Sequence, residues 1–267
     1  MAKVILITGA SAGIGRACAD HLQGRGGWTV VGASRRGSSS GGWTPMVMDV
    51  DDDESVRSGV ATILQQHSRL DAVIACAGWG LAGPVELTPV SEAKNQLETN
   101  FWGAVRIVQE ALPIMRHQGS GRIVLISSIG GMIGIPFQAF YSASKFAMEG
   151  YGEALAYEVA PFGINVTLVE PGNVRTDFTS NRRDVPSSQV EDTYSAAVAK
   201  AVGLMEKDEA NGVDPADVAM AVERVLNASR PRRRISVGKM DERIGILGKR
   251  LLPYRFFEWA AKSSLGV

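Results

Sequence analysis

The sequence is short of cysteine, net charge and metal-ligand clusters. Its only cysteines are Cys18 and Cys76, so a disulfide framework is excluded and a reducing compartment is expected. Lysine plus arginine equals aspartate plus glutamate, at 28 each, so no field of one sign favours nucleic acid as a partner. The histidines share no spacing with acids or cysteines that would bind a metal; they are His21, His67 and His117.

Long apolar runs are also missing. The run in MAKVILITG is short and ends in glycine, so it predicts a first β-strand rather than a signal peptide. The stretch 123–140 is interrupted by serine, glycine and proline and does not predict a membrane span. With 45% hydrophobic residues in 267, the chain can bury one substantial core. We expect a single cytoplasmic domain over 1–267.

The sequence does contain a regular alternation of short β-branched runs and longer amphipathic segments. Several runs are apolar without alternation, which is typical of strands covered on both faces. The pattern predicts an α/β fold with a doubly wound, seven-stranded parallel sheet and helices on both faces, and such sheets bind ligands beyond the carboxyl ends of their strands. The predicted strands are 4–8, 29–33, 46–50, 71–77, 122–128, 164–171 and 234–238; the predicted helices are 13–24, 53–67, 89–115, 141–160 and 214–228.

A glycine-rich segment, TGASAGIG, directly follows the first predicted strand. Gly9, Gly13 and Gly15 allow the backbone to approach a diphosphate, and the helix that begins there presents unpaired N–H groups and a positive dipole end. Ser11 and Ile14 belong to the same turn. The segment predicts a dinucleotide-binding turn, and a turn without a ligand is the alternative.

The second predicted strand ends in GASRR, which bears on the choice of nucleotide. An acidic residue at this place holds the ribose of NAD, whereas Ser34, Arg35 and Arg36 offer a hydroxyl and guanidinium groups to a 2′-phosphate. We therefore expect NADP(H) in preference to NAD(H). Two solvated loop arginines are the alternative.

Two further strand ends are expected to flank the adenine and a ribose. Asp49, with Val50, could accept a hydrogen bond from the adenine amino group, and a cap for the next helix is the alternative. The turn Cys76, Ala77 and Gly78 ends the fourth strand. Cys76 is interpreted as a small buried side chain rather than a nucleophile.

The segment YSASKFAMEGYGEALAYEV places a lysine where a core-facing apolar residue belongs. Burying the Lys145 ammonium is costly unless something uses it, and Tyr141 lies one helical turn away. A positive charge beside the phenol would lower its pKa toward the range of an acid/base catalyst. A lysine that snorkels from a half-buried helix is the alternative. The shared face comprises Tyr141, Lys145, Met148, Gly152, Leu155, Ala156 and Val159.

Three other polar features are less specific. Asn100, in a predicted helix with Leu97 and Ala104, either bonds backbone or organises water near the site. Ser128 ends the fifth strand, where it could bond a substrate oxygen or cap the strand. The segment PGNVRT ends the sixth strand in a turn suited to passing a flat ring.

In this combination and order, the segments TGASAGIG, CAG, YSASK and PGNVRT, with Asn100 and Ser128, resemble the short-chain dehydrogenase/reductase family in its single-domain branch. The resemblance covers residues 3 to about 238 and implies a Rossmann fold. It implies that Tyr141 is the general acid/base, that Ser128 polarises the substrate oxygen, and that Lys145 lowers the tyrosine pKa and bonds the nicotinamide ribose. It also implies a water on Asn100. The turn after the sixth strand would hold the nicotinamide through Pro171, Gly172, Val174 and Thr176.

Two positions depart from the family's pattern. Cys76 stands where asparagine is usual, and Ala12 is not basic, so one of two usual NADP markers is absent and the case rests on Ser34 and Arg35. Within the family the sequence is most similar to the branches of hydroxysteroid and retinol dehydrogenases. The expected substrate wall beside Ser128 is apolar, and some of its members could instead be core or dimer residues. That wall is Trp79, Met132, Ile133, Ile135 and Phe137.

The C-terminal third predicts accessory parts around this site. Segment 177–212 is expected to form a movable lid over the substrate. The basic and aromatic tail 239–267 could lie on a membrane surface, cover the pocket or contact a partner subunit. The resemblance also implies a homodimer or homotetramer.

The sequence thus predicts an NADP(H)-dependent oxidoreductase that interconverts a hydrophobic ketone or aldehyde and its alcohol. One alternative is a nicotinamide-dependent epimerase, and another is a non-catalytic NADP(H)-binding sensor that engages a protein. The tyrosine, lysine and serine set argues against a sensor, because a sensor has no need of an ammonium buried beside a phenol.

Overall fold

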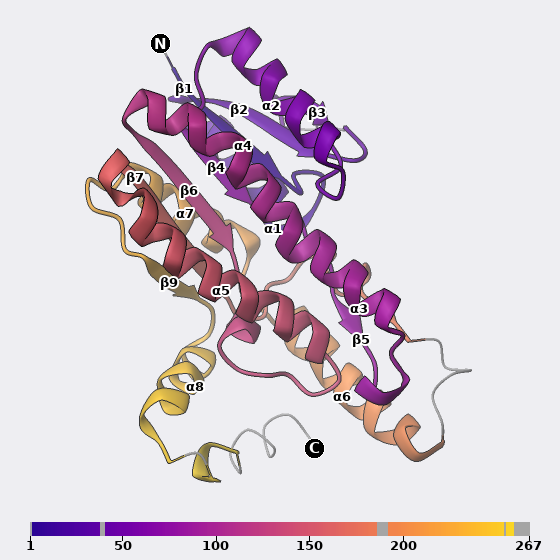
Figure 1. The fold of residues 1–267 in the computed structure, drawn as a ribbon. Coiled ribbons are helices and arrows are strands. Elements are labelled where there is room, and N and C mark those ends of the chain that lie inside the picture. Colours follow the sequence, from indigo (N-terminus) through magenta and orange to yellow (C-terminus); the bar gives the residue numbers. More distant parts are fainter. Residues whose placement is uncertain (1, 38–40, 186–191, 254, 259–267) are drawn as a thin grey trace.

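A seven-stranded parallel sheet forms the centre of the computed structural model, which describes residues 2–37, 41–185, 192–253 and 255–258. The strand order is β3-β2-β1-β4-β6-β7-β9, and every neighbouring pair is parallel, as predicted (Figure 1). The order reverses between β1 and β4, which is the switch point of a doubly wound sheet. The strands are β1 (Lys3–Thr8), β2 (Trp28–Ser34), β3 (Thr44–Val47), β4 (Ala72–Ala75), β6 (Gly121–Ile126), β7 (Ile164–Pro171) and β9 (Arg234–Val237).

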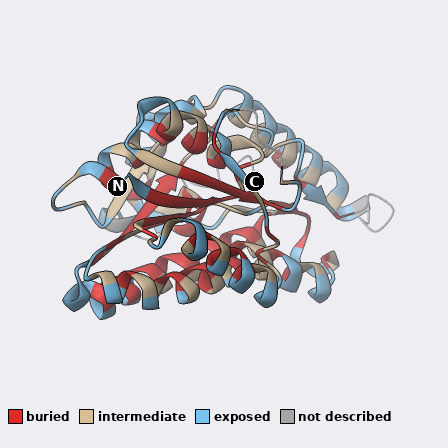
Figure 2. Cartoon of the chain, turned by 90° about the horizontal axis from the view of Figure 1, so that it is seen from above, coloured by how far each residue is buried: buried red, intermediate tan, exposed pale blue. Residues whose placement is uncertain are grey.

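Helices cover both faces of this sheet and bury one hydrophobic cluster on each side. One cluster lies under α2, α4 and α5, and the other lies under α1 and α7. Figure 2 shows the buried strands between two helical layers whose outer sides are exposed. The α-helices are α1 (Gly13–Arg25), α2 (Asp53–His67), α3 (Val90–Leu97), α4 (Gly103–Gln118), α5 (Ala139–Val159), α6 (Asp192–Ala210), α7 (Pro215–Asn227) and α8 (Met240–Leu251). Short helical turns are η1 (Val85–Leu87), η2 (Glu98–Trp102), η3 (Ile129–Gly131) and η4 (Ala160–Phe162).

Three features differ from the sequence prediction. The third strand is Thr44–Val47 rather than 46–50, so Asp49 lies in the loop after it. The helix predicted over 89–115 is interrupted by η2, a π-helical turn that contains Asn100. A second, two-stranded sheet pairs β5 (Leu81–Ala82) with β8 (Arg183–Asp184), which joins the predicted lid to the loop after β4.

The predicted lid and tail are both partly described. The lid contains β8 and α6, and its residues 186–191 lie outside the described residues. The tail contains α8, whereas position 254 and the predicted tail residues Trp259 and Lys262 lie outside the described part. Among the helices that are described, none is both long and apolar enough to cross a membrane.

Candidate active site

A cavity of about 1140 Å³ opens at the carboxyl edge of the sheet. It brings together nearly all the residues predicted to bind the nucleotide or do the chemistry. Those that line it are Gly9, Ser11, Gly13, Ile14, Gly15, Ser34, Arg35, Arg36, Asp49, Val50, Cys76, Ala77, Gly78, Trp79, Ser128, Ile133, Ile135, Tyr141, Lys145, Pro171, Gly172, Val174 and Thr176. The predicted residues that are not among its lining are Asn100, Met132 and Phe137.

The glycine-rich turn leaves no room for a Cβ atom at Gly9 or Gly15. Gly9 has a φ of 70°, and a Cβ there would lie 2.9 Å from the Cα of Ala77. A Cβ on Gly15 would lie only 2.4 Å from the carbonyl oxygen of Gly9. The turn therefore keeps backbone amides open to a ligand at the start of α1.

The first turn of α1 differs from the first turns of α2 and α7. Asp52 caps α2 by accepting a hydrogen bond from Ser55 N at 2.6 Å, and Asp214 caps α7 through Ala216 N at 2.9 Å. Among the described residues, no side chain caps α1 at Ala12, and its first turn carries no acid. Unpaired N–H groups at a helix start form an anion site, so these residues fit the diphosphate of a dinucleotide.

The ends of β2 and β3 bring polar groups to the same cavity. Arg36 Nη2 donates to Ser11 Oγ at 2.9 Å, which ties the end of β2 to the glycine-rich turn. Ser34 Oγ accepts from Gly37 N at 3.2 Å. Asp49 Oδ1 accepts from Asp51 N at 3.1 Å, while Asp52 is the cap of α2. The helix-cap alternative for Asp49 is therefore wrong.

Tyr141 and Lys145 lie on the buried face of α5, as predicted. Their exposed fractions are 8% and 6%. Lys145 Nζ donates to the carbonyl oxygen of Ile126 at 2.9 Å, and Nζ lies 5.9 Å from the centre of the Tyr141 ring. The Phe178 ring packs edge-on against Tyr141 with centroids 5.6 Å apart. The lysine is thus held inside the protein and does not snorkel to solvent.

The pKa of Tyr141 moves in the opposite direction from the sequence prediction. Burial raises the pKa of this phenol to about 12, and a hydrogen bond with Ser128 only partly opposes the rise. Burial also lowers the pKa of Lys145 to about 8. The prediction considered only the attraction of the ammonium, whereas removal from water dominates at both groups. Tyr141 is therefore a neutral phenol near pH 7, the form that can give away a proton.

Ser128 lies beside Tyr141, two residues after the end of β6. Its Oγ accepts from Gly130 N at 3.0 Å, so the hydroxyl has a fixed position at the start of η3. A Cβ on Gly130 would lie 3.2 Å from the Tyr141 ring and 3.3 Å from Ser128 Oγ. Glycine at this place keeps the two hydroxyl-bearing side chains together.

Asn100 bonds backbone, which was one of the two roles predicted for it. Its Oδ1 accepts from Trp79 N at 3.0 Å, and its Nδ2 donates to Trp79 O at 3.0 Å and to Ser144 Oγ at 3.2 Å. The preceding turn is held by Thr8, whose Oγ1 accepts from Cys76 N and Ala77 N at 3.0 and 3.2 Å. The hydroxyl of Thr8 thus supports the turn in which Cys76 departs from the family's pattern.

A buried acidic pair behind Lys145 is absent from the sequence prediction. Glu149 is 5% exposed and Glu170 is 3% exposed. Arg234 Nη2 lies 3.3 Å from Glu149 Oε2, and Ser236 Oγ donates to Glu170 Oε2 at 2.7 Å. Burial, together with the charge of Glu170, raises the pKa of Glu149 to about 7.

Residues of the lid and the tail line part of the cavity, although they were not individually predicted to do so. Phe178 and Met205 line the cavity, as do Ile244, Leu252 and Phe257 from α8 and the turn after it. Glu209 of α6 accepts from Thr179 Oγ1 at 2.5 Å and pairs with the buried Arg182. The sequence indicated only the general position of a lid and of a basic and aromatic tail that could cover the pocket.

The dinucleotide turn, the doubly wound sheet and the tyrosine, lysine and serine set define an oxidoreductase of the Rossmann class. A family model described as short chain dehydrogenase matches residues 3–186. The chain is 40% identical over 261 residues to 3-ketodihydrosphingosine reductase of Bacteroides thetaiotaomicron, covering 97% of each chain. It is 34% identical over 301 residues to retinol dehydrogenase 8 of Bos taurus, covering 99% of this chain and 94% of that protein.

A solved short-chain dehydrogenase from Streptomyces avermitilis has a similar structure, with a TM-score of 0.83, 32% identity and 98% coverage of each chain. The chain therefore belongs to the short-chain dehydrogenase/reductase family. It is an enzyme of the class that acts on CH–OH groups.

Proposed function

We propose that this enzyme reduces the ketone of a long, apolar substrate with NADPH, and that Tyr141 gives the proton. The observation that carries the proposal is the meeting of Tyr141, Ser128 and Lys145 on a cavity with many apolar lining residues. At about 1140 Å³, the cavity exceeds the roughly 300–1000 Å³ of ordinary ligand pockets, which leaves room for a nucleotide and an apolar chain. The apolar members are Ile133, Ile135, Phe178, Met205, Ile244, Leu252 and Phe257.

The protonation state of Tyr141 favours reduction. A bound NADPH supplies a hydride to the carbonyl carbon, and the oxygen then needs a proton. With its pKa raised by burial, Tyr141 holds that proton at neutral pH and can donate it to the oxygen. Ser128, fixed by Gly130 N, would orient the same oxygen, and the Lys145 ammonium would stabilise the phenolate that forms.

The two curated relatives support an apolar substrate. One is named for the reduction of a ketone, 3-ketodihydrosphingosine, and the other is named for retinol. Both names refer to molecules that combine a long apolar part with one oxygen that takes part in the reaction. The relative with 40% identity favours a lipid ketone as the substrate, and a retinoid is the second candidate.

The preference for NADPH is part of the proposal. Arg35 and Arg36 both line the cavity at the end of β2, where the 2′-substituent of the adenosine ribose lies in this class of fold. Guanidinium groups bind phosphate with paired hydrogen bonds, whereas NAD offers a neutral hydroxyl at this place.

Oxidation of NADPH in the presence of long-chain ketones, followed by absorbance, tests the proposal. We expect turnover with 3-ketodihydrosphingosine and with ketones whose apolar chain is somewhat shorter. Tyr141→Phe should lower kcat by about 10³-fold, because it removes the proton donor and keeps the ring. Tyr157→Phe is the matched control, since this tyrosine lies on the same helix with 58% of its surface exposed.

Two results would contradict the proposal. Unchanged turnover in Tyr141→Phe would show that another group gives the proton. Turnover of retinal but of no ketone would replace the lipid ketone with the second candidate. The binding of NADPH, measured by its fluorescence, should be retained in the variant and would show that the protein is folded.

A further inference from the structure

Helix α8 is attached to the body along one side. Glu242 Oε1 accepts from Asn173 N at 2.9 Å and from Asn173 Nδ2 at 2.7 Å. Lys249 Nζ donates to Met132 O at 2.5 Å, and Ile246 is only 7% exposed. Because an α-helix has 3.6 residues per turn, positions 242, 246 and 249 lie on one side. The rotation of α8 about its axis is therefore fixed by contacts at both of its ends.

The opposite side of α8 presents apolar side chains to water. Met240 is 67% exposed, Ile244 58%, Leu247 54% and Leu251 72%. Their spacing of four, three and four residues places them on a single stripe. An amphipathic helix normally turns such a stripe to the core, whereas α8 turns it outward. A contiguous exposed stripe of this kind marks an interaction surface.

Positive charge accompanies this apolar stripe. Arg243 lies within α8 beside the stripe, and the exposed Lys239 and Arg255 lie before and after the helix. Asp241 is exposed and lines the cavity together with Lys239, whereas Glu242 is held by Asn173, so Arg243 and Arg255 are, among the described residues, the charges beside the stripe that do not line this cavity. An apolar stripe flanked by lysine and arginine is complementary to a bilayer with anionic headgroups.

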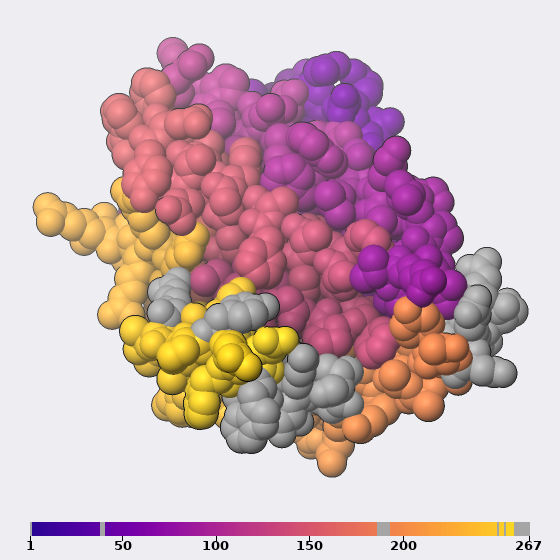
Figure 3. Space-filling model, turned by 60° about the horizontal axis from the view of Figure 1, so that its bottom comes forward, coloured from indigo at the N-terminus to yellow at the C-terminus, as the bar shows by residue number. Residues whose placement is uncertain are grey.

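The stripe is also continuous with the substrate cavity. Ile244 belongs both to the stripe and to the cavity lining, and Gly248 and Leu252 of the same segment line the cavity. Figure 3 shows α8 and α6 on the same face of the molecule. A surface seated on the stripe would therefore lie beside the wall of the cavity.

We propose that the outward stripe of α8 docks this enzyme on an anionic lipid bilayer, with α8 lying flat in the headgroup region. This inference rests on the proposed function, because a long-chain ketone resides in a membrane and has little solubility in water. Docking through α8 places the cavity next to the acyl chains, so the substrate reaches Tyr141 without crossing bulk water.

Cosedimentation with vesicles tests the docking independently of catalysis. Vesicles of phosphatidylcholine alone are compared with vesicles that also contain phosphatidylglycerol, without nucleotide or substrate. We expect binding to the anionic vesicles that weakens with salt. The double variant Leu247→Glu with Leu251→Glu should weaken it about 100-fold, since two leucines are lost and two charges repel the surface. Neither residue lines the cavity, so NADPH turnover of a short soluble ketone should be unchanged.

Val90→Glu is the matched control, because Val90 is 68% exposed at the start of α3 and does not line the cavity. It should bind anionic vesicles like the unaltered enzyme. Equal binding of the double variant, or no binding of the unaltered enzyme, would overturn the proposal. Conversion of a dimer to a monomer by the double variant, measured by light scattering, would assign the stripe to a second copy. Absence of ketone turnover with intact vesicle binding would instead count against the proposed function.

Discussion

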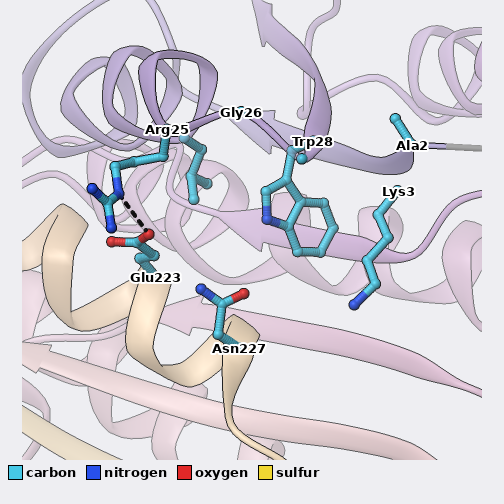
Figure 4. Close-up of a pocket in the computed structure, with 9 residues that line it drawn as sticks. Ala2, Lys3, Arg25, Gly26, Trp28, Glu223 and Asn227 are labelled. Atoms are coloured by element: carbon cyan, nitrogen blue, oxygen red, sulfur yellow. Dashed lines mark hydrogen bonds and ion pairs between the residues drawn. The ribbon is translucent and has the colours of Figure 1, made fainter.

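The ionisable side chains at the two edges of the parallel sheet differ in their surroundings and in the direction in which their pKa values are shifted. At the amino edge, a hollow of about 460 Å³ lies between the starts of β1 and β2 and the ends of α1 and α7 (Figure 4). There Glu223 Oε1 lies 3.1 Å from Arg25 Nε, and Glu223 Oε2 lies 2.8 Å from His21 Nε2. Lys3 Nζ stands 5.6 Å from the centre of the Trp28 ring.

At the carboxyl edge, the ionisable groups are buried and their pKa values are displaced. Burial lowers the pKa of Lys145 to about 8 and raises those of Glu149 and Tyr141 to about 7 and 12. At the amino edge, hydrogen bonds with His21 and Arg25 lower the pKa of Glu223, which favours its charged form. The difference indicates that the charged side chains at the amino edge stabilise the fold by pairing with one another. At the carboxyl edge, the charged forms are destabilised by burial, and such groups are suited to transferring protons in a reaction.

Replacement of one lysine at each edge is expected to give the largest difference in activity. Lys145→Met should lower kcat/KM for ketone reduction by about 10³-fold, because the ammonium that stabilises the developing phenolate is lost. Lys3→Met should leave kcat/KM unchanged, since Lys3 is exposed and contacts Trp28. Comparable losses in both variants, measured under identical conditions, would remove the distinction between the edges.

Replacement of one arginine at each edge is expected to give the second-largest effect, on the preference for NADPH over NADH. Arg35→Asp should shift the ratio of kcat/KM for NADPH over NADH by about 10²-fold toward NADH, because a carboxylate repels the 2′-phosphate and can hold a ribose hydroxyl. Arg25→Asp at the amino edge should leave this ratio unchanged. An unaltered ratio in Arg35→Asp would refute the phosphate contact.

The buried carboxyl group of Glu149 should make the stability of the enzyme depend on pH. Because burial raises its pKa from 4.5 to about 7, the folded state holds an extra proton between these values. Stability of the unaltered enzyme should therefore fall as pH rises through this window, and the loss should be complete above pH 7. Glu149→Gln removes this penalty, so it should gain on the order of 3 kcal/mol relative to the unaltered enzyme well above pH 7 and little below 4.5.

Urea unfolding at several pH values measures this difference. Glu153→Gln is the matched control, because Glu153 also pairs with Arg234 at 2.7 Å but its side chain is 53% exposed. Its effect should be small and nearly flat with pH. A flat difference for Glu149→Gln would show that the buried carboxylate carries no ionisation penalty.

Glu223 should show the smallest effect and the opposite sign. Its pKa is lowered by His21 and Arg25, so its contribution to stability is present above its ordinary pKa and is lost as pH falls through the lowered one. Glu223→Gln should cost up to about 1 kcal/mol near pH 7 and leave turnover unchanged. A gain of stability at pH 7 in urea unfolding would contradict the assignment of this pair to cohesion.

The sheet and the nucleotide turn could be predicted because their signals are local. Strands buried on both faces require continuous apolar runs, and TGASAGIG needs glycines where Gly9 and Gly15 exclude any Cβ. The stripe of α5 was visible for the same reason, since helical spacing alone placed Lys145 among apolar residues. These features depend on neighbours in sequence, and the structure bears them out.

The remaining features depend on contacts between distant segments. The pairing of β5 with β8 needs Arg183 N to reach Gly80 O, at 2.8 Å, across about a hundred residues. The raised pKa of Tyr141 results from all the residues that exclude water from its hydroxyl group. These residues come from distant segments, so the spacing of residues in the sequence does not predict the shift. Glu170 had a signal that could have been used, because a charge within the apolar run INVTLVEP must find a buried partner.

Ile126, the last residue of β6, and the two residues that follow it each lie next to an ionisable side chain of α5. The carbonyl oxygen of Ile126 accepts a hydrogen bond from Lys145 Nζ, the Ser127 side chain lies beside Glu149, and the Ser128 side chain lies beside Tyr141. Three consecutive positions thus meet three ionisable groups on one helix. In the observed register of β6 and β7, Ile126 pairs with Val169. A shift of this register by one residue would place a different residue beside each of the three ionisable groups. The alignment of the proton donor is therefore set by strand pairing that never touches a substrate.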